Sequence, residues 1–174
     1  MESRAKLFGH PIHPMLIPFP LGLLATALVF DLIHLLFDEM SLTRAAYYMI
    51  AAGIIGGLLA AVFGLIDWLA IPGGTRAKSI GLRHMVLNVI VLVLFAVAWF
   101  LRNDEPHDVD TTSFILELIG GGIAAVSGWL GGELVDRLGV GVDRGANLDA
   151  PSSLTNRPAS DDVAGVAGGP GVVR

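Results

Sequence analysis

Two histidines near the start of the chain, His10 and His13, each precede a proline in the stretch Gly9-His10-Pro11-Ile12-His13-Pro14. A residue before proline favours extended backbone. A polyproline-like turn takes three residues, so both imidazoles can face the same way. Further along, His84 and Asn88 are four residues apart and share one face of a helix. Imidazole is the common protein ligand of non-covalently held haem and of many divalent metals. These residue types are therefore candidates for a cofactor site.

Asp67, which a tryptophan follows, belongs to the same group as these histidines and Asn88. Three interpretations of the group are open. A haem b would take its axial ligands from His84 and from His13 or His10, with Asp67 and Asn88 orienting the imidazoles. A divalent metal would use imidazoles and a carboxylate. A purely structural group would pair Asp67 with His84 or the arginine before it, while the His-Pro segment folds over as a lid.

A second group of ionisable residues consists of Asp31, His34 and Glu117. Asp31 and His34 are three residues apart and so share a helix face. An ionisable residue within a membrane span is costly and usually faces the protein interior. We expect a buried polar contact that ties the first and last spans together, with a proton path or a second cofactor site as the alternatives.

Long apolar stretches must position both groups. Of the 174 residues, 53% are hydrophobic, and the mean hydropathy is +0.68. Residues 45–66 and 85–101 contain no charged side chain. A bilayer core of about 30 Å requires about 20 apolar residues in a helix. We therefore predict an all-α membrane protein with four transmembrane helices, over residues 19–37, 45–69, 84–102 and 113–133.

An internal similarity links the second and fourth predicted spans. Residues 55–64 and 119–128 are identical at seven of ten positions, at an offset of 64. This similarity predicts two tandem α-hairpins related by a pseudo-twofold axis. Small residues four apart let helices approach closely, or leave a groove for a flat ring. The packing positions we predict are Gly56, Ala60, Gly64, Gly120, Ala124 and Gly128.

The distribution of basic residues predicts the orientation. With the N-terminus inside, seven Lys and Arg residues near the spans are cytoplasmic, and two, Arg44 and Arg102, are outside. The positive-inside rule then places both termini in the cytoplasm. Residues 1–18 become a cytoplasmic His-Pro approach segment, and residues 19–142 become the membrane domain. Residues 143–174, rich in Gly, Ala and Pro, are predicted to be a disordered tail.

Composition also limits the function. The chain has no cysteine, which excludes disulfides, thiolate-held clusters and haem attached through cysteine. The sequence has no stripe of basic residues of the kind that predicts nucleic acid binding. We find no nucleophile paired with a base and no phosphate-binding loop, so a non-enzymatic role is favoured. The partners expected are the lipid bilayer and either a second copy of the chain or a redox protein.

Several stretches together resemble a bacterial membrane-protein family catalogued as domain of unknown function 2231. They are the opening Gly9 to Pro14, Gly64-Leu65-Ile66-Asp67-Trp68, Arg83-His84 with Asn88, and Trp129 to Val135. The resemblance covers residues 7–142 and implies a small four-helix protein of the bacterial inner membrane, with no settled activity.

This family in turn looks distantly similar to four-helix b-type membrane cytochromes, which hold two haems between paired histidines. Two haems would need four histidines within the spans, and here only His34 and His84 lie clearly within them. The resemblance therefore implies at most a single haem, near the cytoplasmic face, with His84 as one ligand and His13 or His10 as the other.

Overall fold

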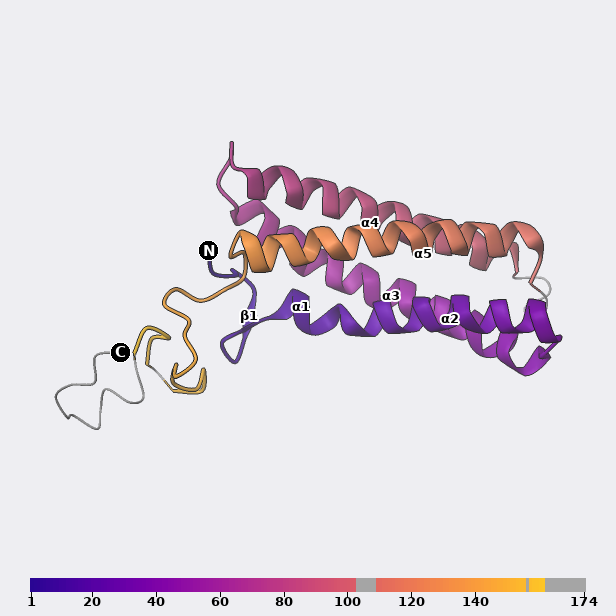
Figure 1. The fold of residues 1–174 in the computed structure, drawn as a ribbon, viewed down its shortest axis with the longest axis horizontal. Coiled ribbons are helices and arrows are strands. Elements are labelled where there is room, and N and C mark those ends of the chain that lie inside the picture. Colours follow the sequence, from indigo (N-terminus) through magenta and orange to yellow (C-terminus); the bar gives the residue numbers. More distant parts are fainter. Residues whose placement is uncertain (103–108, 156, 162–174) are drawn as a thin grey trace, which may run out of the picture.

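The computed structural model describes residues 1–102, 109–155 and 157–161. Four long helices lie lengthwise in a bundle (Figure 1). The segments Ile12–Phe37, Met40–Ala70, Arg76–Leu101 and Thr111–Arg137 are each long and apolar enough to cross a membrane. The predicted all-α membrane fold with four spans is therefore confirmed. In chain order the elements are β1 (Lys6–Leu7), β2 (His10–Pro11), α1 (Ile12–Leu16), α2 (Pro18–Phe37), α3 (Met40–Ala70), α4 (Arg76–Leu101), α5 (Thr111–Gly132) and the π-helical turn η1 (Glu133–Arg137).

The bundle consists of two hairpins. Helix α2 packs mainly along α3 and helix α4 mainly along α5, and the most extensive contact between the hairpins is that of α3 with α4. The N-terminus, the α3–α4 loop and η1 lie at one end of the bundle (Figure 1). We call this end the N-terminal end, and the end that carries the α2–α3 turn the opposite end. At that turn Asp38 takes a left-handed conformation (φ 55°), which ends α2.

Helix capping extends the helices beyond the predicted spans. Helix α4 begins at Arg76, eight residues before the predicted start, because the Thr75 hydroxyl accepts a bond from the Lys78 amide at 3.1 Å. At the start of α5 the Asp110 carboxylate accepts bonds from the amides of Thr112 (2.7 Å) and Ser113 (3.0 Å). These bonds, and above all one from the Ser113 hydroxyl, hold the pKa of Asp110 below its usual value.

Small residues let the helices of each hairpin pack closely. A Cβ atom on Gly53 would lie 2.7 Å from the Leu24 side chain, and one on Gly120 would lie 2.9 Å from Phe95. Leu24 and Phe95 are buried at the centre of the apolar core. The contact of Gly53 with Leu24 in the first hairpin thus corresponds to the contact of Gly120 with Phe95 in the second. Between α3 and α5 the corresponding glycines are 67 residues apart, an offset that we call the 67-residue register. This register differs from the offset of 64 in the sequence similarity.

The predicted packing residues meet different neighbours. Gly56 faces Phe19, Gly64 faces the His13 ring, and Gly120 faces Phe95. Ala60 is buried, and Ala124 packs against the apolar core. A Cβ on Gly128 would have no described atom within 4 Å, so the packing expected there is absent from the described contacts. The 67-residue register explains this difference, because it matches Gly64 with Gly131.

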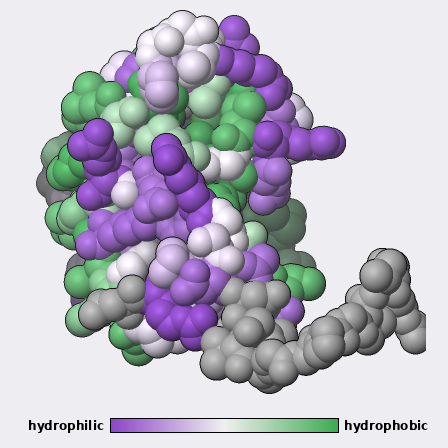
Figure 2. Space-filling model, turned by 90° about the vertical axis from the view of Figure 1, so that its left-hand side faces the viewer, coloured by the Kyte–Doolittle hydropathy of each residue, from purple (hydrophilic) through white to green (hydrophobic). Residues whose placement is uncertain are grey.

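Polar and apolar surfaces are divided as a membrane requires. Large apolar side chains are exposed along the sides of all four long helices, among them Leu36, Ile55, Val93 and Trp129. Figure 2 looks onto the N-terminal end, where hydrophilic residues gather, while hydrophobic residues lie at its margins. Outward-facing apolar residues on helices of this length fit a lipid environment.

Candidate functional site

Two imidazoles, one from each half of the chain, meet near the N-terminal end. The ring centroids of His13, in α1, and His84, in α4, are 6.4 Å apart, with their planes at 89°. His13 Nδ1 is 2.8 Å from the carbonyl oxygen of Ala60, and His84 Nδ1 is 2.8 Å from that of Ser127. A carbonyl only accepts, so each Nδ1 carries a proton. In the neutral ring Nε2 then presents its lone pair.

Glycine leaves room for each ring. A Cβ on Gly64 would lie 2.9 Å from the His13 ring, and a Cβ on Gly131 would lie 3.2 Å from the His84 ring. Each glycine comes four residues after the residue whose carbonyl accepts the Nδ1 bond. One turn of α3 and one turn of α5 therefore hold an imidazole in the same way.

The predicted neighbour Asn88 lies beside His84. Its Nδ2 is 3.1 Å from His84 Nε2 and donates to the His84 carbonyl at 2.9 Å. Ser127, whose hydroxyl is 3.1 Å from His84 Nδ1, was not among the predicted site residues. Ser127 occurs within the second copy of the repeated sequence, which was the available signal.

Asp67 lies apart from the two imidazoles. Its carboxylate accepts bonds from the Ser3 hydroxyl at 2.7 and 2.8 Å, from the Arg4 amide at 2.8 Å and from the Ala5 amide at 3.3 Å. Residues 3–5 lie beside Asp67 at the N-terminal end of the bundle, so the Ser3 hydroxyl and the amides of Arg4 and Ala5 reach its carboxylate. Asp67 therefore anchors the N-terminal segment, instead of pairing with His84 or Arg83 as the structural interpretation expected.

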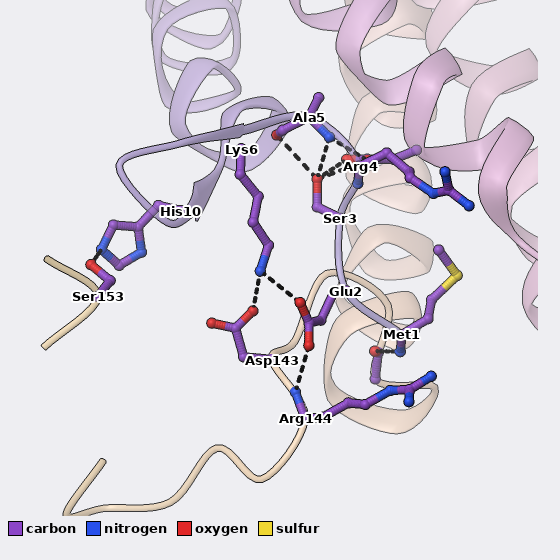
Figure 3. A network of polar contacts seen from close by, with 12 residues as sticks. Met1, Glu2, Ser3, Arg4, Ala5, Lys6, His10, Asp143, Arg144 and Ser153 are labelled. Carbon is purple, nitrogen blue, oxygen red and sulfur yellow. Dashed lines mark hydrogen bonds and ion pairs between the residues drawn. The ribbon is translucent and has the colours of Figure 1, made fainter. Parts of the chain in front are cut away.

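His10 also lies apart from the two imidazoles. It is exposed in β2, and its Nε2 is 3.1 Å from the Ser153 hydroxyl (Figure 3). Close by, Lys6 donates to Glu2 at 3.0 Å and to Asp143 (Figure 3). The bond with Asp143 does most to raise the pKa of Lys6, and the bond with Lys6 does most to lower that of Glu2. Asp143, Arg144 and Ser153 of the predicted tail thus contact the N-terminal segment, while residues 156 and 162–174 lie outside the described residues.

Replacing Asp67 with alanine is expected to release the N-terminal segment. A hydrogen bond to a charged group contributes about 1.5–3 kcal/mol, so losing several should raise the open fraction at least about tenfold. Limited trypsin digestion after Arg4 and Lys6 measures this as a faster cleavage rate. The matched control is Asp143→Asn, which removes a half-exposed ion pair with an expected contribution of about 1 kcal/mol or less. Equal cleavage rates in the two variants would contradict the anchoring role.

At the opposite end of the bundle, Arg102 joins two of the predicted polar residues. Its Nη1 contacts Asp31 Oδ2 at 2.5 Å and Glu117 Oε1 at 3.3 Å. Its Nη2 contacts Asp31 Oδ1 at 3.3 Å and donates to the Thr43 carbonyl at 3.0 Å. All three charged side chains are fully buried. Asp31, Arg102 and Glu117, which we call the ion cluster, come from α2, the end of α4 and α5.

Arg102 was predicted to be an outer-loop charge and was not among the predicted site residues. His34, the third residue of the predicted group, lies one turn after Asp31 and is also buried. Its Nδ1 has no hydrogen-bond partner among the described residues. Over the same part of the chain, no group of three or more His, Cys, Asp or Glu residues is arranged to hold a metal ion.

A comparison with family models identifies the family of this chain. The model described as "Predicted membrane protein (DUF2231)" matches residues 9–144. Comparisons with curated proteins and with solved structures give no match. The matched region includes the four long helices, both imidazoles and the ion cluster, and it is most of the chain. The chain therefore belongs to the DUF2231 family of membrane proteins.

Proposed function

We propose that this protein binds one haem b through His13 and His84 and acts in electron transfer. The observation that carries the proposal is the paired arrangement of the two rings, 6.4 Å apart, with both Nδ1 atoms held by carbonyls. Metal-binding imidazoles are typically oriented in this way through their other nitrogen. Two imidazoles bonded to one ion at about 2 Å have ring centroids roughly 5–6.5 Å apart.

The number of ligands favours haem over a free divalent ion. Protein sites for a bare zinc ion use three or four side-chain ligands. The described residues offer only His13 and His84 at this position, and no larger ligand group. Haem brings four ligand nitrogens of its own, so two imidazoles are sufficient, and its iron would supply one-electron chemistry when bound.

Several residues of this chain would hold and orient the two ligands. The carbonyls of Ala60 and Ser127 fix the ring orientations, and Gly64 and Gly131 leave space beside the rings. Asn88 Nδ2 occupies the lone pair of His84 Nε2, so ligand binding requires this amide to turn away. The Asn88 amide also donates to the His84 carbonyl, so it keeps a hydrogen-bond partner when it leaves Nε2.

The Asn88 contact also favours a second candidate function. Because Asn88 already satisfies His84, the same residues could serve as a polar contact between helices without any cofactor. The protein would then be a structural or accessory membrane protein, with a second copy of the chain or a redox protein as its partner.

The proposed setting is the bacterial inner membrane with both termini in the cytoplasm. Burial of Arg102 in the ion cluster strengthens the charge asymmetry, because it leaves Arg44 as the one exposed basic residue near the opposite end among the described residues. Seven basic residues lie near the span ends on the N-terminal side. The positive-inside rule supports this orientation, which brings His13 and His84 near the cytoplasmic face.

The test is an absorption spectrum of detergent-purified protein, expressed with haem precursor and recorded before and after dithionite. We expect a Soret band and the sharp reduced bands of six-coordinate b haem. His13→Ala and His84→Ala should each abolish this spectrum. His10→Ala and His34→Ala are the matched controls and should leave it unchanged. A wild-type protein without a Soret band, or a band that survives both ligand changes, would overturn the haem proposal.

The structural alternative predicts a different outcome of the same experiment. No variant would then bind haem, and His84→Ala would lower the melting temperature, because the backbone and Asn88 lose their partner.

A further inference from the structure

The charges of the ion cluster do not balance. One guanidinium, that of Arg102, contacts two carboxyl groups, those of Asp31 and Glu117, and all three side chains are fully buried. Two ionised carboxylates would leave one negative charge without a counter-ion among them. A buried, uncompensated charge is strongly unfavourable within a membrane protein. The arrangement therefore calls for one additional positive charge or one additional proton.

The geometry distinguishes the two carboxyl groups. Asp31 contacts both Nη atoms of Arg102, at 2.5 and 3.3 Å, which is the two-point pairing of an ionised carboxylate. Glu117 has a single contact with Arg102, at 3.3 Å, and its Oε2 has no hydrogen-bond partner among the described residues. The ionised pair is thus Asp31 with Arg102, and Glu117 is the carboxyl group for which the neutral form is favourable.

The other groups around the cluster provide few ways to place the extra positive charge. Helix α3 contributes the Thr43 carbonyl, and Ser113 of α5 directs its hydroxyl to Asp110. On α4, Trp99 Nε1 lacks a partner in the described structure, and this atom can only donate. Among the described residues, the neighbour that can carry a positive charge is His34 of α2, whose Nδ1 also lacks a described partner. An imidazolium there would bury a charged N–H without an acceptor, which is costly.

We propose that Glu117 holds a proton at neutral pH and that the ion cluster is a proton-binding site within the membrane. The fixed pair of Asp31 and Arg102 lies against the Glu117 carboxyl group and holds it in place in its neutral form. This site lies at the opposite end from His13 and His84, so the inference does not depend on haem binding.

Infrared spectroscopy of the full chain in detergent or lipid at pH 7 tests the inference. We expect a carbonyl-stretch band of a protonated carboxylic acid, which Glu117→Gln removes. Asp31→Asn should also remove it, because Glu117 then becomes the only counter-ion of Arg102. His34→Asn is the matched control and should leave the band in place. A wild-type spectrum without such a band, or a band unaffected by Glu117→Gln, would overturn the proposal.

Thermal unfolding gives a second, independent readout. A neutral carboxyl group and an amide are alike in size and polarity, so Glu117→Gln should lower the melting temperature only slightly. Asp31→Asn should lower it far more, because it removes the two-point pairing with Arg102, and the single 3.3 Å contact of Glu117 replaces that pairing only in part. If Glu117 were an ionised partner of Arg102, the two variants would be destabilised to a similar degree, and the proposal would fail.

Discussion

Replacing Arg102 with methionine should lower the free energy of unfolding by about 3–5 kcal/mol, the typical effect of removing one partner from a buried ion pair. The change leaves the buried carboxylate of Asp31 without a counter-ion. It also removes the donor to the Thr43 carbonyl, which ties the end of α4 to α3. Unfolding in a denaturing detergent, followed by circular dichroism, measures the loss.

Two further variants make the Arg102 result interpretable. Arg44→Met removes an exposed basic residue near the same end and should have an effect within about 0.5 kcal/mol. Adding Asp31→Asn to Arg102→Met removes the unpaired charge and should restore much of the lost stability. Similar losses for Arg102→Met and Arg44→Met would mean that the ion cluster does not stabilise the bundle.

Replacing Gly64 with leucine should destabilise the protein by about 1–3 kcal/mol, the usual effect of overpacking. A Cβ at this position already lies 2.9 Å from the His13 ring, so the larger side chain must displace the imidazole. If His13 binds haem, the Soret band should be lost as well. Thermal shift and absorption spectra measure the two effects.

Gly128→Leu is the matched control for Gly64→Leu. The two glycines are equivalent in the sequence similarity, but a Cβ on Gly128 meets no described atom within 4 Å. We expect a change within about 0.5 kcal/mol, since leucine has the better helix propensity and nothing described opposes it. Equal destabilisation by both changes would favour the 64-residue register over the 67-residue register.

Hydropathy was sufficient to predict the four helices, because an uninterrupted apolar run of this length is typical of a membrane-spanning helix. The helix ends could not be predicted from it, since capping residues determine where a helix begins. Glu39 and Thr75 start α3 and α4 five and eight residues before the predicted spans. The short elements β1, β2 and α1 have no apolar pattern and were not predicted.

The two polar groups were predictable in part. The spacing of His84 and Asn88 predicts one helix face, and that contact forms. Asp67 lies near the same end of the bundle as the two imidazoles, but position along a helix does not determine what a side chain contacts, and the amides of Arg4 and Ala5 bind its carboxylate instead. Arg102 was missed because a basic residue after an apolar run normally faces water. Only the fold brings two acids from distant helices to it.

The ion cluster also has a consequence for biogenesis. Asp31 is synthesised 71 residues before Arg102, so α2 and α3 are made and can enter the bilayer before the counter-ion exists. During that interval the first hairpin holds an unpaired acid in an apolar medium, a state of high free energy. The second hairpin has no such problem, because Arg102 and Glu117 are both within it. A chain interrupted before Arg102 therefore keeps the Asp31 carboxyl group unpaired, and this distinguishes it from the complete protein.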